Sequence, residues 1–365
     1  MQRRSFLKKA GLGAVAGAAV AAPAVAQGNP KISWKMTTTY SPTLPALYGA
    51  AQAFCKMVEE ATEGNFSIRL YPAGEIVPGF GVMDAVTTNT VECGFTASYY
   101  YYGKDPALCF DTAVPFGLNV RQLDAWMSKG GGLELMRQLF APRHIVNFPM
   151  GNTGTQMGGW YRKQIASVAD LKGVKMRTAG FAGEVLARMG VVPQQIPPSD
   201  IYASLEKGTL DAVEFVGPLD DEKLGLQKVA KYYYYPGWWE GSAQVSLYIN
   251  DAVYDKLPKH YQAIIAMASR YAGEQMTAAY DAGNSAALRR LIASGAVLKA
   301  FPRDVMDTAF QVSNAVYKEF CDKDPMFKKV HDSYMAFRDD VAPWFRLAEG
   351  SYDNYLGIAL ANARK

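Results

Sequence analysis

The sequence predicts an α/β fold with two lobes, followed by a long helical C-terminal region. Segments with the apolar–polar alternation typical of β-strands are interspersed with segments of helical periodicity. This pattern occurs in two separate series along the chain. Strands that alternate with helices indicate βαβ units around a parallel sheet. Two such series, joined by crossing segments, predict two lobes with a cleft between them.

The first series predicts a first α/β lobe over residues 27–150. Ile32, Trp34 and Met36 alternate with polar residues, as expected for a half-buried strand. The next segment has helical spacing and stops before Gly64, a residue type common after helix ends. The expected elements are a strand at 32–36, a helix at 44–62, a strand at 66–70, a short helix at 82–86 and a strand at 91–96.

The second series predicts a second α/β lobe over residues 151–257. Gly173, Gly190 and Gly208 separate its segments, as glycines do at turns and helix ends. A strand at 145–150 leads into the series. The elements expected after it are strands at 157–162, 174–177, 191–196 and 210–215, with helices at 182–189 and 200–207.

For residues 258–365 the sequence predicts a helical region with one return strand. We expect this region to pack across both lobes. The stretch at 261–292 carries an apolar stripe with helical spacing. The elements expected after it are a strand at 296–300 and helices at 302–322, 324–338 and 342–363.

The N-terminal residues 1–26 predict a removable export signal. Arg3 and Arg4 precede an uncharged apolar run, and residues 24–26, Ala-Val-Ala, offer the small side chains that a signal peptidase requires. The paired arginines indicate the twin-arginine export route. We therefore expect the mature protein to work in the periplasm.

The charge balance gives no sign of an anionic partner. The full chain has a formal net charge of +4. The signal holds four basic residues and no acidic one, so the mature chain is formally neutral. A neutral chain gives no reason to expect nucleic acid or an anionic membrane as a partner.

Four cysteines remain after the signal, and the periplasm permits disulfides. Their spacings form no disulfide framework. We expect buried free thiols, and a bridge between Cys93 and Cys109 remains an open alternative. The four are Cys55, Cys93, Cys109 and Cys321.

The sequence shows no constellation typical of an enzyme. Its three histidines, His144, His260 and His331, form no pair with zinc-ligand spacing, and no Gly-x-Ser-x-Gly motif or phosphate-binding loop is present. We expect each histidine to be a surface or locally hydrogen-bonded residue, and the protein not to be an enzyme.

Arg177 is the first candidate for ligand binding. It ends the expected strand at 174–177, and Gly180 follows before a helix. In open α/β sheets, the carboxyl ends of strands face the crevice where ligands bind. A guanidinium group matches a carboxylate with two parallel hydrogen bonds. An ordinary surface ion pair is the alternative interpretation.

Three further polar residues lie in constrained segments. Glu214 ends the expected strand at 210–215, Glu240 follows two tryptophans, and Gln156 lies in a glycine-rich stretch. Each is a candidate ligand-binding residue. The alternative for each is a loop side chain hydrogen-bonded to nearby backbone.

These residues lie within motifs at 74–79, 103–106, 151–154, 180–183, 191–196, 205–212, 216–225 and 232–241. In these motifs, and over essentially its whole length, the chain resembles the solute receptors of TRAP transporters, the tripartite ATP-independent periplasmic systems. It resembles in particular the subfamily that binds 2-oxo acids such as pyruvate together with a metal ion. The resemblance implies a two-lobed periplasmic binding protein with a ligand cleft between the lobes.

The resemblance also implies roles for individual residues. Arg177 matches the arginine that takes the ligand carboxylate. The cation would be held by the Gln156 side chain, Glu214, the backbone carbonyl of Phe215, and Glu240.

Oxygen ligands of this kind suit sodium or calcium. The formal charges of Arg177, Glu214, Glu240 and a monocarboxylate total −2. Bound calcium would bring this total to 0, and bound sodium would bring it to −1. The charge count thus favours calcium, whereas the resemblance favours sodium, the ion that we expect.

Tyr100 and Tyr101 follow the strand at 91–96, where their hydroxyls are candidates for bonding ligand oxygens; aromatic packing at the hinge is the alternative. Phe215 and Tyr102 stand where the subfamily has tryptophan. Because of this difference, the size of the ligand stays open: it could be pyruvate, lactate or a longer 2-oxo or 2-hydroxy acid. The alternative of a 2-hydroxy acid goes together with calcium as the cation.

The resemblance further implies delivery of the ligand to TRAP membrane permease subunits, and a homodimer formed through the C-terminal helices. A sensor that presents the ligand to a signalling partner is the alternative.

Overall fold

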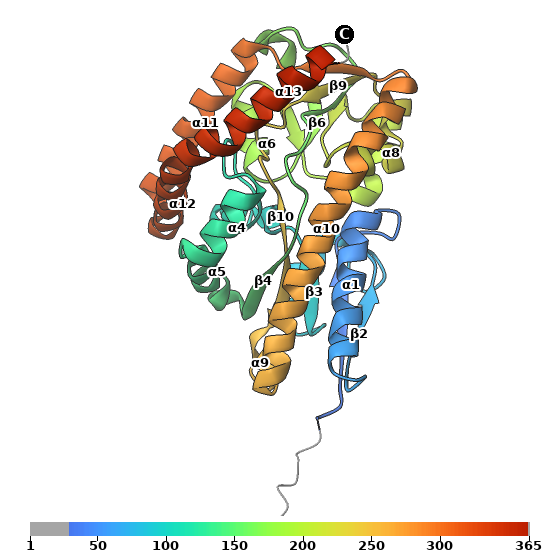
Figure 1. The fold of residues 1–365 in the computed structure, drawn as a ribbon, viewed down its shortest axis with the longest axis vertical. Helices are drawn as coiled ribbons and strands as arrows, with labels where there is room; N and C mark the ends of the chain where they lie inside the picture. The colour runs from blue at the N-terminus through green and yellow to red at the C-terminus, as the bar shows by residue number, and fades with distance from the viewer. Residues whose placement is uncertain (1–28, 364–365) are drawn as a thin grey trace, which may run out of the picture.

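The computed structural model describes residues 29–363. The predicted export signal at 1–26 lies outside this range. Figure 1 shows two α/β halves stacked along the long axis of the molecule, with helix α10 running beside both. Within residues 29–363, no helix is both long enough and apolar enough to cross a membrane.

The first half is built on a five-stranded sheet in the order β2-β1-β3-β10-β4. β1 is parallel to β2 and β3, whereas β10 is antiparallel to β3 and β4. The strands are β1 (Ile32–Thr38), β2 (Phe66–Tyr71), β3 (Cys93–Thr96), β4 (Ile145–Asn152) and β10 (Gln244–Asn250).

The second half is built on a six-stranded sheet in the order β11-β9-β5-β8-β6-β7. β6 is parallel to β7 and β8, and β11 is parallel to β9, whereas β5 is antiparallel to β8 and β9. The strands are β5 (Gly159–Tyr161), β6 (Lys175–Arg177), β7 (Val192–Gln194), β8 (Ala212–Val213), β9 (Tyr232–Tyr235) and β11 (Val297–Ala300).

Both sheets are mixed, so the expectation of parallel sheets was wrong. The antiparallel strands are β5, which runs against β8 and β9, and β10, which runs against β3 and β4. β10 falls inside the range 151–257 expected for the second lobe, yet all seven of its residues are buried in the first sheet. Strands buried on both faces lose the alternation that distinguishes a strand in sequence, which explains why β10 was not expected.

The first sheet is covered by α1 (Pro45–Ala61), predicted at 44–62, and by α2 (Val82–Thr87). The helices between residues 103 and 144 were not predicted, and the two longest of them are α4 (Val120–Lys129) and α5 (Gly132–Phe140). α4 begins with a capping box in which Asn119 and Gln122 each accept a hydrogen bond from the other's backbone N–H. The spacing Asn-x-x-Gln was the available signal for this start. The remaining short helices are α3 (Cys109–Thr112), α6 (Gly180–Arg188), α7 (Ile201–Glu206), α8 (Pro218–Leu224) and α9 (Asp251–Tyr254).

Helix α10 (Lys259–Ala293) links the two halves along one side of the molecule (Figure 1). At its first turn, Tyr261 stacks on Phe66 of the first sheet, with ring centres 5.6 Å apart. Near its other end, the hydroxyl of Tyr280 donates a 2.5 Å hydrogen bond to Asp220 of α8. A single rigid helix thus contacts elements of both halves.

The chain ends in three helical segments, α11 (Arg303–Lys323), α12 (Pro325–Phe345) and α13 (Ser351–Ala363), with a π-helical turn at Arg346–Gly350. The predicted break between 338 and 342 was wrong, because α12 continues through it. The break lies at the π-helical turn, shortly after Pro343, whose ring removes one helical hydrogen bond.

The four cysteines are free thiols in this structure. Cys55, Cys93 and Cys109 are buried, as expected, and the bridge between Cys93 and Cys109 is absent. Cys321 differs from the expectation because it is partly exposed, at the end of α11.

Candidate ligand and cation site

Three segments that carry the candidate residues are tied together by backbone hydrogen bonds. The N–H of Gln156 donates to the carbonyl of Glu240 at 3.1 Å, and the N–H of Gly237 donates back to the carbonyl of Gln156 at 3.0 Å. The N–H of Met157 donates to the carbonyl of Val216 at 3.0 Å. Residues far apart in the sequence are therefore held in fixed positions around one point.

Two glycines permit this close approach. A Cβ atom on Gly159 would lie 2.4 Å from the carbonyl oxygen of Val213 and 3.0 Å from Cα of Glu214. A Cβ atom on Gly237 would lie 2.7 Å from the carbonyl oxygen of Met157. Since no real side chain is tolerated at such distances, glycine at both positions is a condition for the geometry of the site.

Arg177 ends β6 and is fully buried. Its Nη1 donates to the side chain of Glu214 at 2.5 Å and to the Glu214 carbonyl at 2.7 Å, and its Nε donates to the carbonyl of Ile196 at 3.2 Å. Its guanidinium carbon lies 5.6 Å from the ring centre of Phe215. Nη2 is buried without a hydrogen-bond partner. Nε and Nη1 are therefore anchored, and only Nη2 is free to donate to a ligand.

The charged state of Arg177 is secured by its acidic neighbours. Burial opposes the charged form, but Glu214 and the surrounding acidic groups outweigh burial and raise the pKa of Arg177. The arrangement accordingly presents a permanent positive charge inside the protein.

Two buried carboxyl groups share this environment. Burial raises the pKa of Glu214 to about 7, against the lowering effect of Arg177. Burial, followed by repulsion from Glu214, raises the pKa of Glu240 well above its ordinary value. Two carboxyl groups held this way have a strong preference for either a proton or a cation.

Several buried polar atoms of this cluster have no partner among the described residues. Gln156 Oε1, Glu214 Oε2 and both carboxylate oxygens of Glu240 are unpaired, as is Nη2 of Arg177. Buried polar groups are almost always hydrogen-bonded or bound to an ion, so this concentration indicates a binding site. The free acceptors are all hard oxygens, a donor set that fits Na⁺ or Ca²⁺.

A small cavity adjoins the cluster and is lined from both halves of the molecule. Its volume is about 10 Å³, which is enough for one water molecule. Gln156 and Phe215 line it from one side, and Tyr40, Tyr99 and Tyr100 from the other.

The two predicted tyrosines differ in position. Tyr100 lines the cavity. The hydroxyl of Tyr101 instead accepts a 3.0 Å hydrogen bond from the N–H of Met83 and lies 3.3 Å from the hydroxyl of Thr96, inside the first half. Tyr99, which was not predicted, lies at the cleft, and burial and then Glu240 raise its pKa. Adjacent tyrosines in a short helical turn point in different directions, a feature that residue order does not reveal.

A second layer of buried acids supports the site. Asp221 accepts hydrogen bonds from Trp160 at 3.0 Å and Tyr233 at 2.7 Å. Burial raises the pKa of Asp221 to about 6 and that of Asp220 to about 7. Both acids lie in the sequence motif at 216–225. Their hydrogen-bond donors belong to β5, β9 and α10, so the sequence motif alone did not indicate these contacts.

The histidines are hydrogen-bonded locally, as expected. His144 lies 3.1 Å from Asp251, and His260 lies 3.1 Å from Asn29. His331 lies 3.1 Å from Asp332.

Two α/β halves joined by crossing strands, with a buried charged cluster and a cavity between them, define a solute-binding protein of the two-lobed type. The chain belongs to family 7 of the bacterial extracellular solute-binding proteins, DctP, which matches residues 37–324. The predicted membership among TRAP solute receptors is thereby confirmed.

Several relatives are similar over almost the whole chain. A monocarboxylate 2-oxoacid-binding periplasmic protein of Nostoc sp. is 45% identical over 360 residues, covering 97% of this chain and 99% of its own. A TRAP solute-binding protein of Bordetella bronchiseptica, crystallised as a dimer with calcium and picolinate, is 50% identical, with a TM-score of 0.91 and coverage of 92% of this chain and 100% of its own. One of Pseudoalteromonas atlantica, with sodium and pyruvate, is 37% identical, with a TM-score of 0.87 and coverage of 89% and 99%.

Proposed function

We propose that this protein is the periplasmic receptor of a TRAP transporter, that it binds a small 2-oxo monocarboxylate together with a metal cation, and that it delivers the acid to membrane subunits. One observation carries the proposal. The free Nη2 of buried Arg177 shares its site with the unpaired carboxylate oxygens of Glu214 and Glu240. The free guanidinium nitrogen of Arg177 suits an anionic ligand, and the unpaired oxygens of Glu214 and Glu240 suit a cation. The site is therefore suited to binding an anion and a cation together.

Arg177 is the residue that takes the ligand carboxylate. Its Nη1 and Nε are committed to Glu214 and Ile196, which fixes the plane of the guanidinium and leaves Nη2 to donate. A charge-assisted hydrogen bond in a dry site is about twice as strong as a neutral one. Burial therefore makes Arg177 the main source of affinity for the acid group.

The cation would be held by Gln156, Glu214, Glu240 and the backbone carbonyl of Phe215. Without a positive charge beside them, the two ionised glutamates would repel a carboxylate ligand. A bound cation supplies that charge. The unpaired oxygens of Gln156, Glu214 and Glu240 support these assignments.

Sodium is the ion expected from the resemblance, and calcium is the ion favoured by charge. Calcium neutralises the sum of Arg177, the two glutamates and a monocarboxylate, and the relative at 50% identity carries calcium. Competition between the two ions, measured by calorimetry at fixed pyruvate, decides between them.

The aromatic wall limits the ligand to a small acid. Tyr40, Tyr99, Tyr100 and Phe215 surround a cavity smaller than pyruvate, so entry requires the lobes or the side chains to separate. Pyruvate is the ligand proposed here. Picolinate, bound by the Bordetella relative, shares with pyruvate a donor atom next to the carboxylate. Lactate presents its hydroxyl at the same place and is the alternative.

We further propose export by the twin-arginine route and a homodimer formed through the C-terminal helices. Tyr352, Tyr355 and Ile358 of α13 are more than half exposed, an unusual arrangement for a helix with so much apolar surface. A second copy that covers this face would bury it.

Mass spectrometry and elemental analysis of the purified protein test the function directly. We expect a 2-oxo monocarboxylate and one sodium or calcium ion per chain. An unrelated ligand such as a sugar, without metal, would contradict the proposal. Recovery of the acid chemically unchanged after release distinguishes a receptor from an enzyme.

A further inference from the structure

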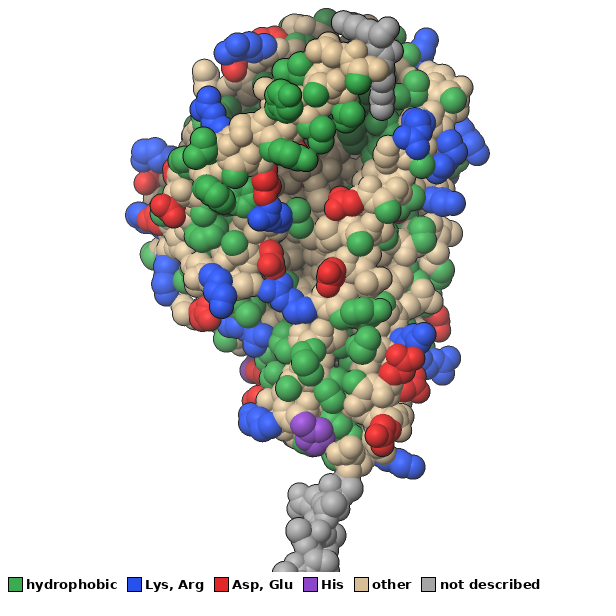
Figure 2. Space-filling model, viewed as in Figure 1, with side chains coloured by type: hydrophobic (Ala, Val, Ile, Leu, Met, Phe, Trp, Pro, Cys, Tyr) green, Lys and Arg blue, Asp and Glu red, His purple; other side chains and the backbone are tan. Residues whose placement is uncertain are grey.

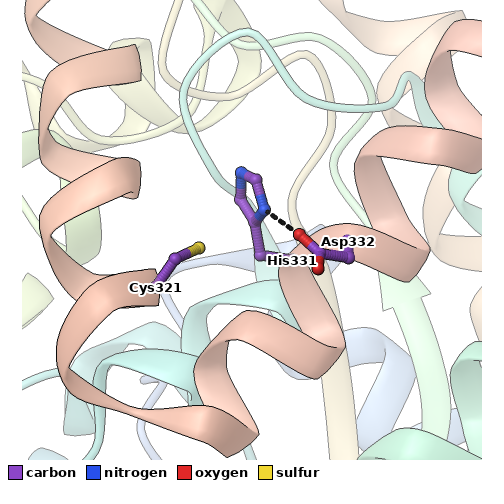
Figure 3. A group of neighbouring side chains, drawn as sticks. All are labelled: Cys321, His331 and Asp332. Atoms are coloured by element: carbon purple, nitrogen blue, oxygen red, sulfur yellow. Dashed lines mark hydrogen bonds and ion pairs between the residues drawn. The ribbon is translucent and has the colours of Figure 1, made fainter.

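Three side chains with metal-binding atoms gather outside the ligand cleft, where α11 meets α12. Cys321 lies in the last turn of α11, and His331 and Asp332 lie on α12. A ligand atom from each of the three lies within 4.8 Å of the other two. Figure 3 shows the sulfur of Cys321 directed toward the ring of His331, with Asp332 on the other side of that ring.

The ring of His331 is held in place by aromatic neighbours. It stacks on Phe327, with centres 6.3 Å apart, and packs against Tyr317 at 5.4 Å. Its Nδ1 lies 3.1 Å from Oδ1 of Asp332. Because the ring and the carboxylate are already fixed relative to each other, little conformational freedom would be lost on binding an ion.

The spacing is close to that of a tetrahedral zinc site. Zn–S bonds of about 2.3 Å and Zn–N or Zn–O bonds of about 2.0–2.2 Å place neighbouring ligand atoms roughly 3.3–3.6 Å apart. The 3.1 Å between His331 and Asp332 already approaches this value. The sulfur of Cys321, at most 4.8 Å away, needs to move by only about 1 Å to match the same tetrahedral spacing.

We propose that Cys321, His331 and Asp332 form a surface zinc site, with the fourth position open to water. A thiolate with an imidazole selects zinc over sodium or calcium, so the site differs in chemistry from the all-oxygen cluster in the cleft. Lys328 pairs with Oδ2 of Asp332 and so orients the carboxylate, while Oδ1, which now faces Nδ1 of His331, would exchange that hydrogen bond for the metal. The proposal is independent of the proposed function, because none of these residues belongs to the cleft.

Titration of the mature protein with zinc chloride, followed by calorimetry, tests this site. We expect one zinc ion per chain at micromolar concentrations, and a loss of affinity of at least about tenfold in Cys321→Ser and in His331→Gln. Cobalt(II) supplies a second readout: the thiolate-to-cobalt absorption band should appear in the unmodified protein and be missing in Cys321→Ser.

Two control variants separate this site from others. His144→Gln removes a more exposed histidine that pairs with Asp251 at the same 3.1 Å distance, and it should leave zinc binding unchanged. Glu240→Gln alters the cleft and should also leave it unchanged. The proposal is overturned if the unmodified protein binds no zinc at micromolar concentrations, or if both Cys321→Ser and His331→Gln bind zinc as tightly as the unmodified protein.

Discussion

Arg177 and Glu214 form a fully buried ion pair, in which one guanidinium nitrogen donates to both the side chain and the backbone carbonyl of Glu214. The pair fixes Arg177 through Nη1 and leaves Nη2 free. We therefore expect these two residues to contribute both to the stability of the cleft and, as proposed above, to its affinity for an anion.

Arg177→Ala should abolish measurable pyruvate binding and lower the free energy of unfolding by about 3–5 kcal/mol, because Glu214 is left buried without its partner. Calorimetry and urea denaturation measure the two effects. Arg188→Ala removes an arginine whose ion pairs with Glu184 and Glu319 are partly exposed, and should cost less than about 1 kcal/mol.

The double variant Arg177→Met, Glu214→Gln separates stability from binding. Removing both charges should restore most of the lost stability, because neither member of the Arg177–Glu214 pair is left as a buried charge without its partner. Pyruvate binding should stay absent. Wild-type affinity in either Arg177 variant would show that the carboxylate binds elsewhere.

Tyr100→Phe and Tyr101→Phe should change different properties, ligand affinity in the first variant and stability in the second. Loss of the Tyr100 hydroxyl should weaken ligand binding with little change in stability, because Tyr100 lines the cavity. Loss of the Tyr101 hydroxyl leaves the buried N–H of Met83 unpaired and should cost about 1–2 kcal/mol of stability. Ligand affinity and the melting temperature, measured for both variants, distinguish the two roles. If ligand affinity fell in Tyr101→Phe but not in Tyr100→Phe, Tyr101 would be the ligand-binding tyrosine, which would contradict these roles.

Asp220 should make the stability of the protein depend on pH. Its pKa is about 7 in the folded protein and 3.8 in a model compound. The folded protein keeps a proton on Asp220 that the unfolded chain releases, so the contribution of Asp220 to stability is largest below about pH 4 and is lost as the pH rises to about 7. Urea denaturation at pH 5 and pH 8 measures this fall.

Asp220→Asn should reduce the fall between pH 5 and pH 8 by about 2 kcal/mol, because the amide does not titrate. Glu214 and Asp221 contribute in the same direction and remain in the variant. An unaltered pH dependence in Asp220→Asn would mean that Asp220 is ionised in the folded protein.

Deletion of residues 351–365 should convert a dimer into a monomer if α13 covers a second copy. Analytical ultracentrifugation at micromolar concentrations measures the mass of both forms. A monomeric full-length protein, or a dimeric truncated one, would contradict the proposed interface.

Much of this organisation could be predicted from the sequence, for reasons that particular residues make clear. Arg177 was predicted to end a strand, as it does in β6, and its binding role was predicted because strand ends in α/β sheets face the ligand crevice; that role stays a proposal. β1, α1 and α10 follow strong periodic patterns and were found nearly to the residue. The burial of Glu214 and Glu240 beside Arg177 agrees with their proposed roles, which nonetheless remain proposals.

Other features depend on contacts that sequence patterns do not contain. β10 is buried along its whole length, so it lacks alternation, and its membership of the first sheet follows from tertiary pairing. The direct pairing of Arg177 with Glu214, and the separation of Tyr100 from Tyr101, depend on side-chain direction. The break in the C-terminal helix is displaced because Pro343 is tolerated inside α12.

The central claim is that the acid and the cation bind together at Arg177 and Glu240. Calorimetry with pyruvate, in chelator-treated, sodium-free buffer and again after addition of calcium or sodium, tests it most directly. We predict tight binding only when a cation is present, and little response to cation in Glu240→Gln. Equal pyruvate affinity with and without cations, in both the unmodified protein and Glu240→Gln, would contradict the account.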